Sequence, residues 1–301
     1  MIQIPNLKQG DSVYILSTAR KISKEELDPA IKVLTAWGLN VILGKTIGAE
    51  NHQMAGTDEL KIADFNEAIS NTTVKAILCA RGGYGTVRII DQIDWKAFSK
   101  TPKWVIGYSD VTTLHGHLNR LGYPSIHATM PINFKTNTSE ALDSLKQTLF
   151  KGGVQYKAGE VHRTGQAEGQ LIGGNLSILY SLLGSPSSVN TDGKILFMED
   201  LDEYLYHIDR MMMNLKRNGY FENLAGLVIG GMTDMNDNAI PFGKSALEII
   251  FEHIEPYSFP VIYNFPAGHL DDNRALIMGY EYEMNASGQE VSLKTKYTSQ
   301  D

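Results

Sequence analysis

The chain has 301 residues, of which 43% are hydrophobic and 20% are charged, and its formal net charge is −7. These values are typical of a globular protein of about two domains, and they exclude a disordered chain and a generally basic nucleic-acid-binding protein. No apolar run approaches the roughly 18 residues that cross a bilayer, and residues 1–8 lack the apolar core of a secretion signal. Because Cys79 is the only cysteine and most simply fills the core, we predict a cytoplasmic protein without membrane or nucleic-acid partners.

Strand and helix signals alternate through the first half of the chain. Short apolar runs predict strands, and amphipathic segments that follow capping residues predict helices. The predicted strands are residues 12–17, 41–43, 76–80 and 104–107, and the predicted helices are residues 24–37, 57–70, 110–121 and 139–150. Because continuously apolar strands are buried on both faces, this order predicts a parallel sheet covered by helices.

A glycine pair at residues 152–153 interrupts this alternation. Five further strands are expected, the first two exposed or at an edge and the others buried, at residues 154–161, 168–172, 195–198, 227–229 and 261–263. A hairpin with its turn at residues 285–288 and its last strand at residues 291–293 is expected to close the chain. We therefore predict an N-terminal parallel-sheet domain over residues 1–152 and a mixed α/β domain over residues 153–301.

The junction between the predicted strand 104–107 and the predicted helix 110–121 carries a serine, Ser109. A hydroxyl at such a junction stands clear of the sheet, beside the unpaired N–H groups of the first helical turn. Those donors could stabilise an oxyanion formed when the serine attacks a carbonyl. Serine is also a favoured N-cap residue, so this segment alone leaves both interpretations open.

A second segment of interest is Arg-Gly-Gly-Tyr-Gly at residues 81–85, which follows another predicted buried strand. Three glycines in four residues allow unusual backbone angles and close approach to a ligand. The segment could be an oxyanion donor loop, a dinucleotide cradle or an ordinary turn. The cradle is disfavoured, because Arg88 stands where G-x-G-x-x-G requires glycine. Since ligands collect at the carboxyl ends of parallel strands, this loop and Ser109 could share one crevice.

A serine nucleophile needs a base, and the base needs an orienting group. Of the eight histidines, His269 is the best candidate base, because it follows a predicted buried strand on a loop containing proline and glycine, although it could merely cap a turn. His127 could also line the crevice. Glu199 is the candidate acid at the end of a buried strand. The acidic run at residues 199–203 could instead bind a cation or be a solvated turn, but no metal-ligand spacing is evident.

Five segments, in this order and spread over the whole chain, resemble the L,D-carboxypeptidase family of serine peptidases. This family includes muramoyl-tetrapeptide carboxypeptidases and microcin C self-immunity peptidases. The segments are Arg-Gly-Gly-Tyr-Gly at 81–85, Gly-Tyr-Ser-Asp at 107–110, Gly-Gly-Asn-Leu at 173–176, Met-Glu-Asp at 198–200 and Ala-Gly-His at 267–269. Each motif is weak alone, but five in the same order are specific.

The resemblance implies that Ser109 is the nucleophile, Glu199 the acid and His269 the base. It also implies that backbone N–H groups of Gly83 and Asp110 stabilise the oxyanion. The expected fold has a flavodoxin-like N-terminal domain and a mixed α/β swivelling C-terminal domain, with the active site between them. Members of the family commonly form homodimers, so a homodimer is expected.

The expected reaction is hydrolysis of a carboxyl-terminal peptide bond, without a metal or an organic cofactor. The resemblance implies that the substrate is a muropeptide, from which a terminal D-alanine is cleaved at an L,D bond during cell-wall recycling. Arg81 could bind the terminal carboxylate in a bidentate pair, or it could pair with a nearby acid. Two alternatives stay open. One is a microcin C-type peptidase that cleaves aminoacyl-nucleotide-like amides, disfavoured because no insertion is evident, and the other is a non-catalytic small-molecule binding protein.

Overall fold

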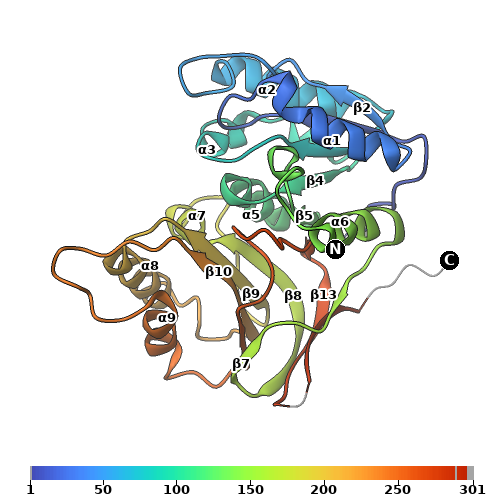
Figure 1. The fold of residues 1–301 in the computed structure, drawn as a ribbon. Coiled ribbons are helices and arrows are strands. Elements are labelled where there is room, and N and C mark those ends of the chain that lie inside the picture. The colour runs from blue at the N-terminus through green and yellow to red at the C-terminus, as the bar shows by residue number, and fades with distance from the viewer. Residues whose placement is uncertain (1, 289, 297–301) are drawn as a thin grey trace.

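The computed structural model describes residues 2–288 and 290–296 and contains two β-sheets, which form an upper and a lower unit in Figure 1. The first half of the chain, blue to green, forms most of the upper unit, and the second half, yellow to red, forms most of the lower one. Within these residues, no helix combines the length and the apolar character needed to span a bilayer.

The upper sheet has six strands. They are β1 (Ser12–Leu16), β2 (Asn40–Leu43), β3 (Val74–Cys79), β4 (Trp104–Gly107), β5 (Ser125–His127) and β12 (Leu276–Met278). The first five are parallel in the order β2-β1-β3-β4-β5, which is the order of flavodoxin-like sheets. The predicted fold class of this unit is therefore confirmed. β12 arrives from the far end of the chain and pairs antiparallel with β5.

Helices cover both faces of this sheet. They are α1 (Lys24–Ala36), α2 (Asp58–Ser70), α3 (Thr86–Ile89), α4 (Trp95–Phe98), α5 (Thr112–Arg120) and α6 (Ser139–Lys151). Because side chains alternate along a strand, Val13 and Ile15 of β1 join an apolar cluster with α1 and α6. Tyr14 and Leu16 join a second cluster with α2 and α5. The sheet is thus buried on both faces, as its apolar strands predict.

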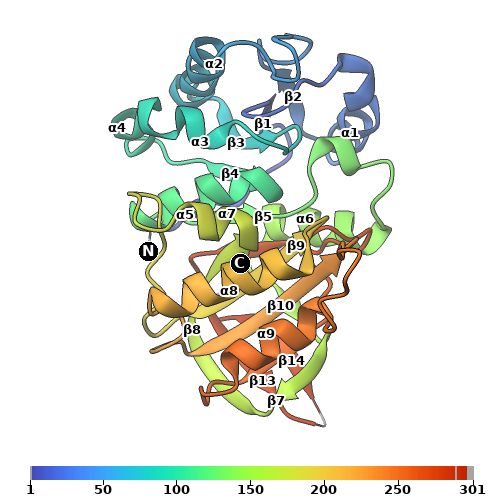
Figure 2. The same cartoon turned by 90° about the vertical axis from the view of Figure 1, so that its left-hand side faces the viewer.

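The lower sheet has eight strands in the order β6-β14-β13-β8-β9-β10-β11-β7, of which β8 to β11 are parallel neighbours. They are β6 (Gln155–Tyr156), β7 (Glu160–Arg163), β8 (Gly165–Asn175), β9 (Ile195–Leu201), β10 (Gly226–Thr233), β11 (Val261–Tyr263), β13 (Glu281–Ala286) and β14 (Val291–Thr295). The helices are α7 (Leu176–Ser181), α8 (Leu205–Arg217) and α9 (Ala246–Ile254). Figure 2 shows α8 and α9 lying over this sheet, where their apolar sides form one cluster with it.

Two expectations for the lower sheet are wrong. The single strand expected at residues 154–161 is two strands, β6 and β7, at opposite ends of the strand order. Residues 168–172, expected to be exposed or at an edge, lie in β8, which pairs with β9 and β13 on its two sides. Polar Glu168 and Gln170 misled this prediction. Polar residues at alternate positions indicate that one face of a strand is exposed, but they do not indicate that its edge is unpaired. The closing hairpin is confirmed, although Asn285 still belongs to β13 and residue 289 lies outside the described residues.

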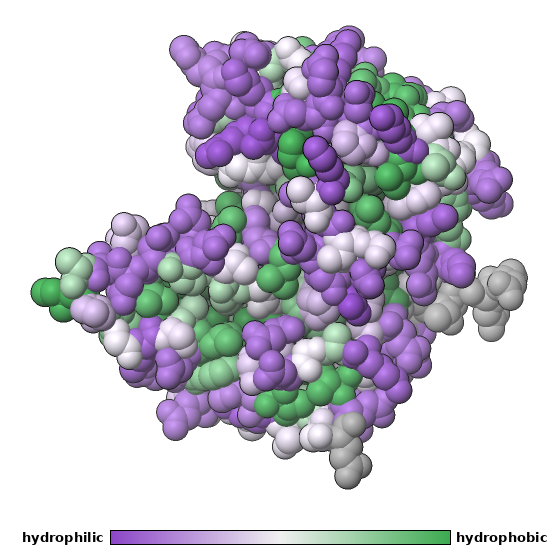
Figure 3. Space-filling model, in the orientation of Figure 1, coloured by the Kyte–Doolittle hydropathy of each residue, from purple (hydrophilic) through white to green (hydrophobic). Residues whose placement is uncertain are grey.

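The connection between the two units carries the predicted domain boundary. The chain leaves α6 at Gly152, whose φ is +63°, and then enters the lower sheet. The boundary between residues 152 and 153 stays a prediction, because β12 returns to the upper sheet. Figure 3 shows the surface indented between the two units at the left of the view.

Candidate active site

An open cavity of about 570 Å³ lies where the carboxyl ends of β1, β3 and β4 face the carboxyl end of β9. Four of the predicted site residues line it, and these are Arg81, Gly83, Ser109 and His269. Its volume is within the usual range for small-molecule sites, and carboxyl ends of parallel strands are where such sites form. The predicted crevice therefore exists in the structure.

Ser109 lies at the strained turn between β4 and α5. Its φ is +64°, a left-handed conformation that costs a non-glycine residue about 1–2 kcal/mol. The predicted helix 110–121 begins with a 3-10 turn over Ser109–Val111, and the Ser109 side chain caps nothing. The N-cap interpretation of Ser109 is therefore wrong. A strained serine between a strand and a helix is instead the geometry that exposes a nucleophilic hydroxyl.

His269 and Glu199 form a tight pair. The His269 Nδ1 lies 2.6 Å from Glu199 Oε2, and the His269 backbone N–H donates to the same oxygen at 3.1 Å. Glu199 is fully buried in β9, and the His269 side chain is 13% exposed. When the ring is neutral, Nδ1–H donates to Glu199 and Nε2 is free to accept a proton.

Glycine makes this pair possible. Gly268 has a φ of +105°, and a Cβ atom at this position would lie 2.7 Å from Cβ and Cγ of Glu199. Burial alone would lower the pKa of His269, but the charge and hydrogen bond of Glu199 outweigh it, so the net shift of this pKa is upward. The pair therefore has the arrangement of a general base held by a carboxylate.

The structure brings Ser109 and His269 to one cavity without joining them. Within the described part of the chain, the Ser109 hydroxyl makes no hydrogen bond, and so none with His269. Tyr108, the neighbour of Ser109, packs its ring edge-on to His269 with a centroid separation of 4.8 Å. Hydrogen bonds between nucleophile and base are often long in enzymes without substrate and shorten when substrate binds.

The predicted oxyanion donors lie beside Ser109. Gly83 has a φ of +119°, and residues 2–288 and 290–296 provide no acceptor for its N–H. The N–H of Asp110 is in the first turn after β4, where N–H groups lack intrahelical partners. The Asp110 carboxylate accepts from the Thr86 N–H at 2.9 Å, so it connects the end of the glycine loop to the turn that carries Ser109. Burial raises the pKa of this carboxyl.

Several cavity residues were missed by the sequence interpretation. Asn175 donates to Asp200 at 2.8 Å, and the Ser177 N–H donates to the other Asp200 oxygen at 2.9 Å. Burial, assisted by the charge of Glu199, raises the pKa of Asp200 to about 7. Asn175 could have been found, because it belongs to the Gly-Gly-Asn-Leu motif.

Arg20 also lines the cavity and was missed. It lies beyond the carboxyl end of β1 (Leu16), and Arg81 lies beyond the carboxyl end of the neighbouring strand β3 (Cys79). By contrast, His127 does not line the cavity, because it is fully buried.

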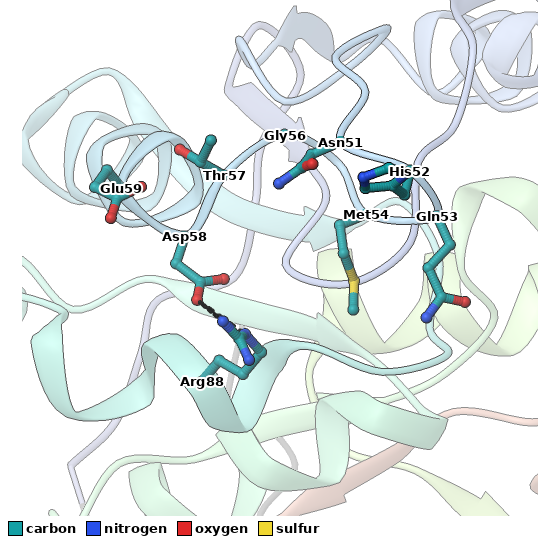
Figure 4. A pocket seen from close by; sticks show the side chains of 9 residues that line it. All are labelled: Asn51, His52, Gln53, Met54, Gly56, Thr57, Asp58, Glu59 and Arg88. Carbon is teal, nitrogen blue, oxygen red and sulfur yellow. Dashed lines mark hydrogen bonds and ion pairs between the residues drawn. The ribbon is translucent and has the colours of Figure 1, made fainter.

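A second cavity, of about 480 Å³, lies at the start of α2 and contains none of the predicted site residues. Figure 4 shows its one arginine, Arg88, paired with Asp58, and the two charged groups lie 2.6 Å apart.

No group of three or more His, Cys, Asp or Glu side chains in the described residues is arranged to hold a metal ion.

Comparison with known proteins identifies the family. Residues 13–128 match the N-terminal domain of LD-carboxypeptidases, and residues 168–284 match their C-terminal domain. A probable murein peptide carboxypeptidase of Bacillus subtilis is 34% identical, over 93% of this chain and 91% of that protein. The microcin C7 self-immunity protein MccF of Escherichia coli is 24% identical, over 97% of this chain and 96% of its own.

A solved structure shares the whole fold. The muramoyltetrapeptide carboxypeptidase of Oxalobacter formigenes superposes with a TM-score of 0.85 and 24% identity, covering 96% of this chain and all of its own. The resemblance stated from the five motifs is thereby confirmed. The chain belongs to the LD-carboxypeptidase family and is a serine-type peptidase.

Proposed function

We propose that this protein is a serine carboxypeptidase that removes the terminal D-alanine from murein tetrapeptides by hydrolysing an L,D-peptide bond. One observation carries the proposal. The buried Glu199 holds His269 in a cavity that also contains the strained Ser109. The names of the Bacillus subtilis and Oxalobacter formigenes proteins support murein peptides as the substrate class.

In the proposed first step, the Ser109 hydroxyl attacks the scissile carbonyl carbon while His269 Nε2 removes its proton. Glu199 stabilises the imidazolium that forms. The carbonyl oxygen becomes an oxyanion, which accepts hydrogen bonds from the N–H groups of Gly83 and Asp110. Loss of one such donor typically costs about 3 kcal/mol of transition-state stabilisation.

In the second step, the carbon–nitrogen bond breaks and the imidazolium of His269 gives its proton to the leaving amine. D-Alanine departs, and the tripeptide stays bound to Ser109 as an ester. Water then attacks this ester while His269 again removes a proton, and the tripeptide is released with a free carboxylate.

Arg81 retains its proposed contact with the substrate carboxylate. Its guanidinium lines the cavity, and one of its terminal nitrogens donates to the Lys21 carbonyl at 3.1 Å. No carboxylate of the described residues pairs with it, so the alternative of a structural ion pair gains no support. A role in cell-wall recycling, a cytoplasmic location and a homodimer also remain predictions.

The experiment is an incubation of the purified protein with disaccharide tetrapeptide and, separately, with an aminoacyl-nucleotide amide, followed by mass spectrometry. Loss of one alanine from the tetrapeptide, abolished by Ser109→Ala, supports the proposal. Cleavage of the nucleotide amide alone would instead support a specificity for aminoacyl nucleotides, a class related to the aspartyl sulfamoyl adenosine with which MccF has been solved. Binding without turnover of either compound would support the non-catalytic alternative.

A further inference from the structure

Arg20 is a cavity residue to which the proposed reaction assigns no role. It follows β1, so it reaches the cavity from the same sheet edge as Arg81 and Ser109. Its backbone is fixed on two sides, since the Ser17 hydroxyl donates to its carbonyl at 2.7 Å and it forms a bridge with Met54. The side chain therefore projects from a well-defined position.

The Arg20 side chain lies directly against the proposed oxyanion donor. A Cβ atom at Gly83 would lie 2.7 Å from Cδ and 2.8 Å from Nε of Arg20. Any residue other than glycine at position 83 would displace this arginine. The Arg20 guanidinium is thus held within a few ångströms of the place where the scissile carbonyl oxygen would bind.

The charge pattern distinguishes Arg20 from arginines with a structural role. Arg88 pairs with Asp58, and Arg274 pairs with Asp272. Across the described residues, no hydrogen bond or ion pair engages the Arg20 guanidinium.

Arg81, its neighbour, also has no carboxylate partner, and its buried Nε has no acceptor at all within the described chain. The part of the lining that follows β9 instead contributes acidic residues, among them Asp202 and Glu203, whose negative charge disfavours an anion on that side. An anionic ligand group is therefore favoured on the wall formed by Arg20 and Arg81.

We propose that Arg20, beside Arg81, binds the free carboxylate of the amino acid that leaves. This inference rests on the proposed function. In a terminal peptide bond, one carbon atom separates the scissile nitrogen from the carboxylate carbon, so the carboxylate must bind close to the oxyanion site. The position of Arg20 over Gly83 meets this requirement. Because an internal peptide bond offers no such carboxylate, the contact would restrict cleavage to the chain end.

The test compares tetrapeptide with a free terminal carboxylate and the same peptide with a terminal amide. Arg20→Met keeps most of the aliphatic stem that covers Gly83 and removes the charge. Charge-assisted hydrogen bonds contribute enough that we expect kcat/KM for the acid to fall roughly 10- to 100-fold, while kcat/KM for the amide stays unchanged. Arg20→Lys should keep part of the preference for the acid that Arg20→Met loses. Lysine keeps the positive charge but cannot make the two parallel hydrogen bonds of a guanidinium to a carboxylate.

Arg88→Met is the matched control, because this arginine lines the other cavity and should leave both rates unchanged. An Arg20→Met protein that still prefers the acid by the wild-type ratio would overturn the inference. Equal losses on acid and amide would also overturn it, since they would show that Arg20 only supports the glycine loop. If the wild-type protein cleaves neither peptide, the proposed function fails, and this inference fails with it.

Discussion

The two sides of the cavity hold their reactive groups in opposite ways. On the upper side, Ser109 is placed by its backbone, with a φ of +64° and no hydrogen bond to its hydroxyl in the described structure. On the lower side, His269 is placed by hydrogen bonds, since its ring and its backbone N–H both contact the buried Glu199. The proposed nucleophile is therefore held at a cost in stability, whereas the proposed base is held by favourable contacts.

This difference teaches that substitutions on the two sides should separate activity from stability. Changes at Glu199 or Gly268 should disturb the base and reduce activity. A change that relieves the backbone at Ser109 should remove activity and yet stabilise the fold. Three predictions test this, and a fourth tests whether the upper sheet stays closed near Ser109.

Glu199→Gln should reduce kcat by about 10³- to 10⁴-fold, because the neutral amide no longer stabilises the imidazolium of His269. Because the ring must be neutral to act as base and the pKa of His269 is raised, the acidic limb of the wild-type rate profile should lie at higher pH than an unperturbed histidine would give. Without the carboxylate charge, burial dominates, the pKa of His269 falls, and the limb should move to lower pH. The measurement is kcat/KM against pH for both proteins.

Asp209→Asn is the matched control for this substitution. His253 and Asp209 form another histidine–carboxylate pair, at 2.9 Å, which does not line the cavity. This variant should keep the wild-type rate and pH profile. An unchanged acidic limb in Glu199→Gln would contradict the assignment of His269 as the base.

Gly268→Ala should reduce kcat/KM about 100-fold, because the added Cβ would lie 2.7 Å from Glu199 and must displace it. Gly184→Ala is the control for backbone strain alone, since Gly184 has a φ of +76° but no atom within 4 Å of its Cβ position. Steady-state kinetics of both variants would check this. Equal activity in the two would show that the Glu199 contact tolerates the added methyl group.

Ser109→Gly should abolish hydrolysis and stabilise the fold by roughly 0.5–1 kcal/mol. Relief of the left-handed strain contributes about 1–2 kcal/mol, and the greater chain entropy of glycine offsets part of it. Ser109→Ala also abolishes hydrolysis but keeps the strain, so its free energy of unfolding should match that of the wild type. Denaturant unfolding of the three proteins decides the matter, and a less stable glycine variant would refute the strain argument.

We expect the thiol of Cys79 not to react with a thiol reagent in the native protein. The side chain is fully buried at the end of β3, and burial raises the pKa of its thiol to about 12. A thiol reagent at pH 8 should therefore label the denatured protein and leave the native one unmodified. Rapid labelling of the native protein would show that the upper sheet opens near the nucleophile.

Much of the upper unit could be predicted because its signals are local. Its central strands are continuous apolar runs, and the capping side chains of Ser23 and Thr57 mark the starts of α1 and α2. β12 could not be predicted, because Leu276–Met278 pairs with a strand far away in sequence and no local pattern encodes that partner. The central position of β8 was missed because its polar residues Glu168 and Gln170 indicated an exposed or edge strand.

Sequence motifs could name the candidate site residues but not their geometry. The family resemblance named Ser109, Glu199 and His269. In the structure, Ser109 and His269 line one cavity, and Glu199 lies behind His269 and contacts its ring. Nothing in the sequence predicted the left-handed backbone conformation of Ser109, because serine rarely adopts this conformation. Arg20 had a weaker signal than Arg81, because it follows a predicted buried strand but lies outside the glycine-rich segment that drew attention to Arg81.

The pairing of β12 with β5 has a consequence for synthesis of the chain. During synthesis, β5 keeps an open edge until residues 276–278 have been made, long after β5 itself. His269, the proposed base, is also made long after Ser109, so a nascent chain that has not reached it would lack the proposed catalytic pair. A prematurely terminated product would lack β12 and expose that edge, which invites aggregation.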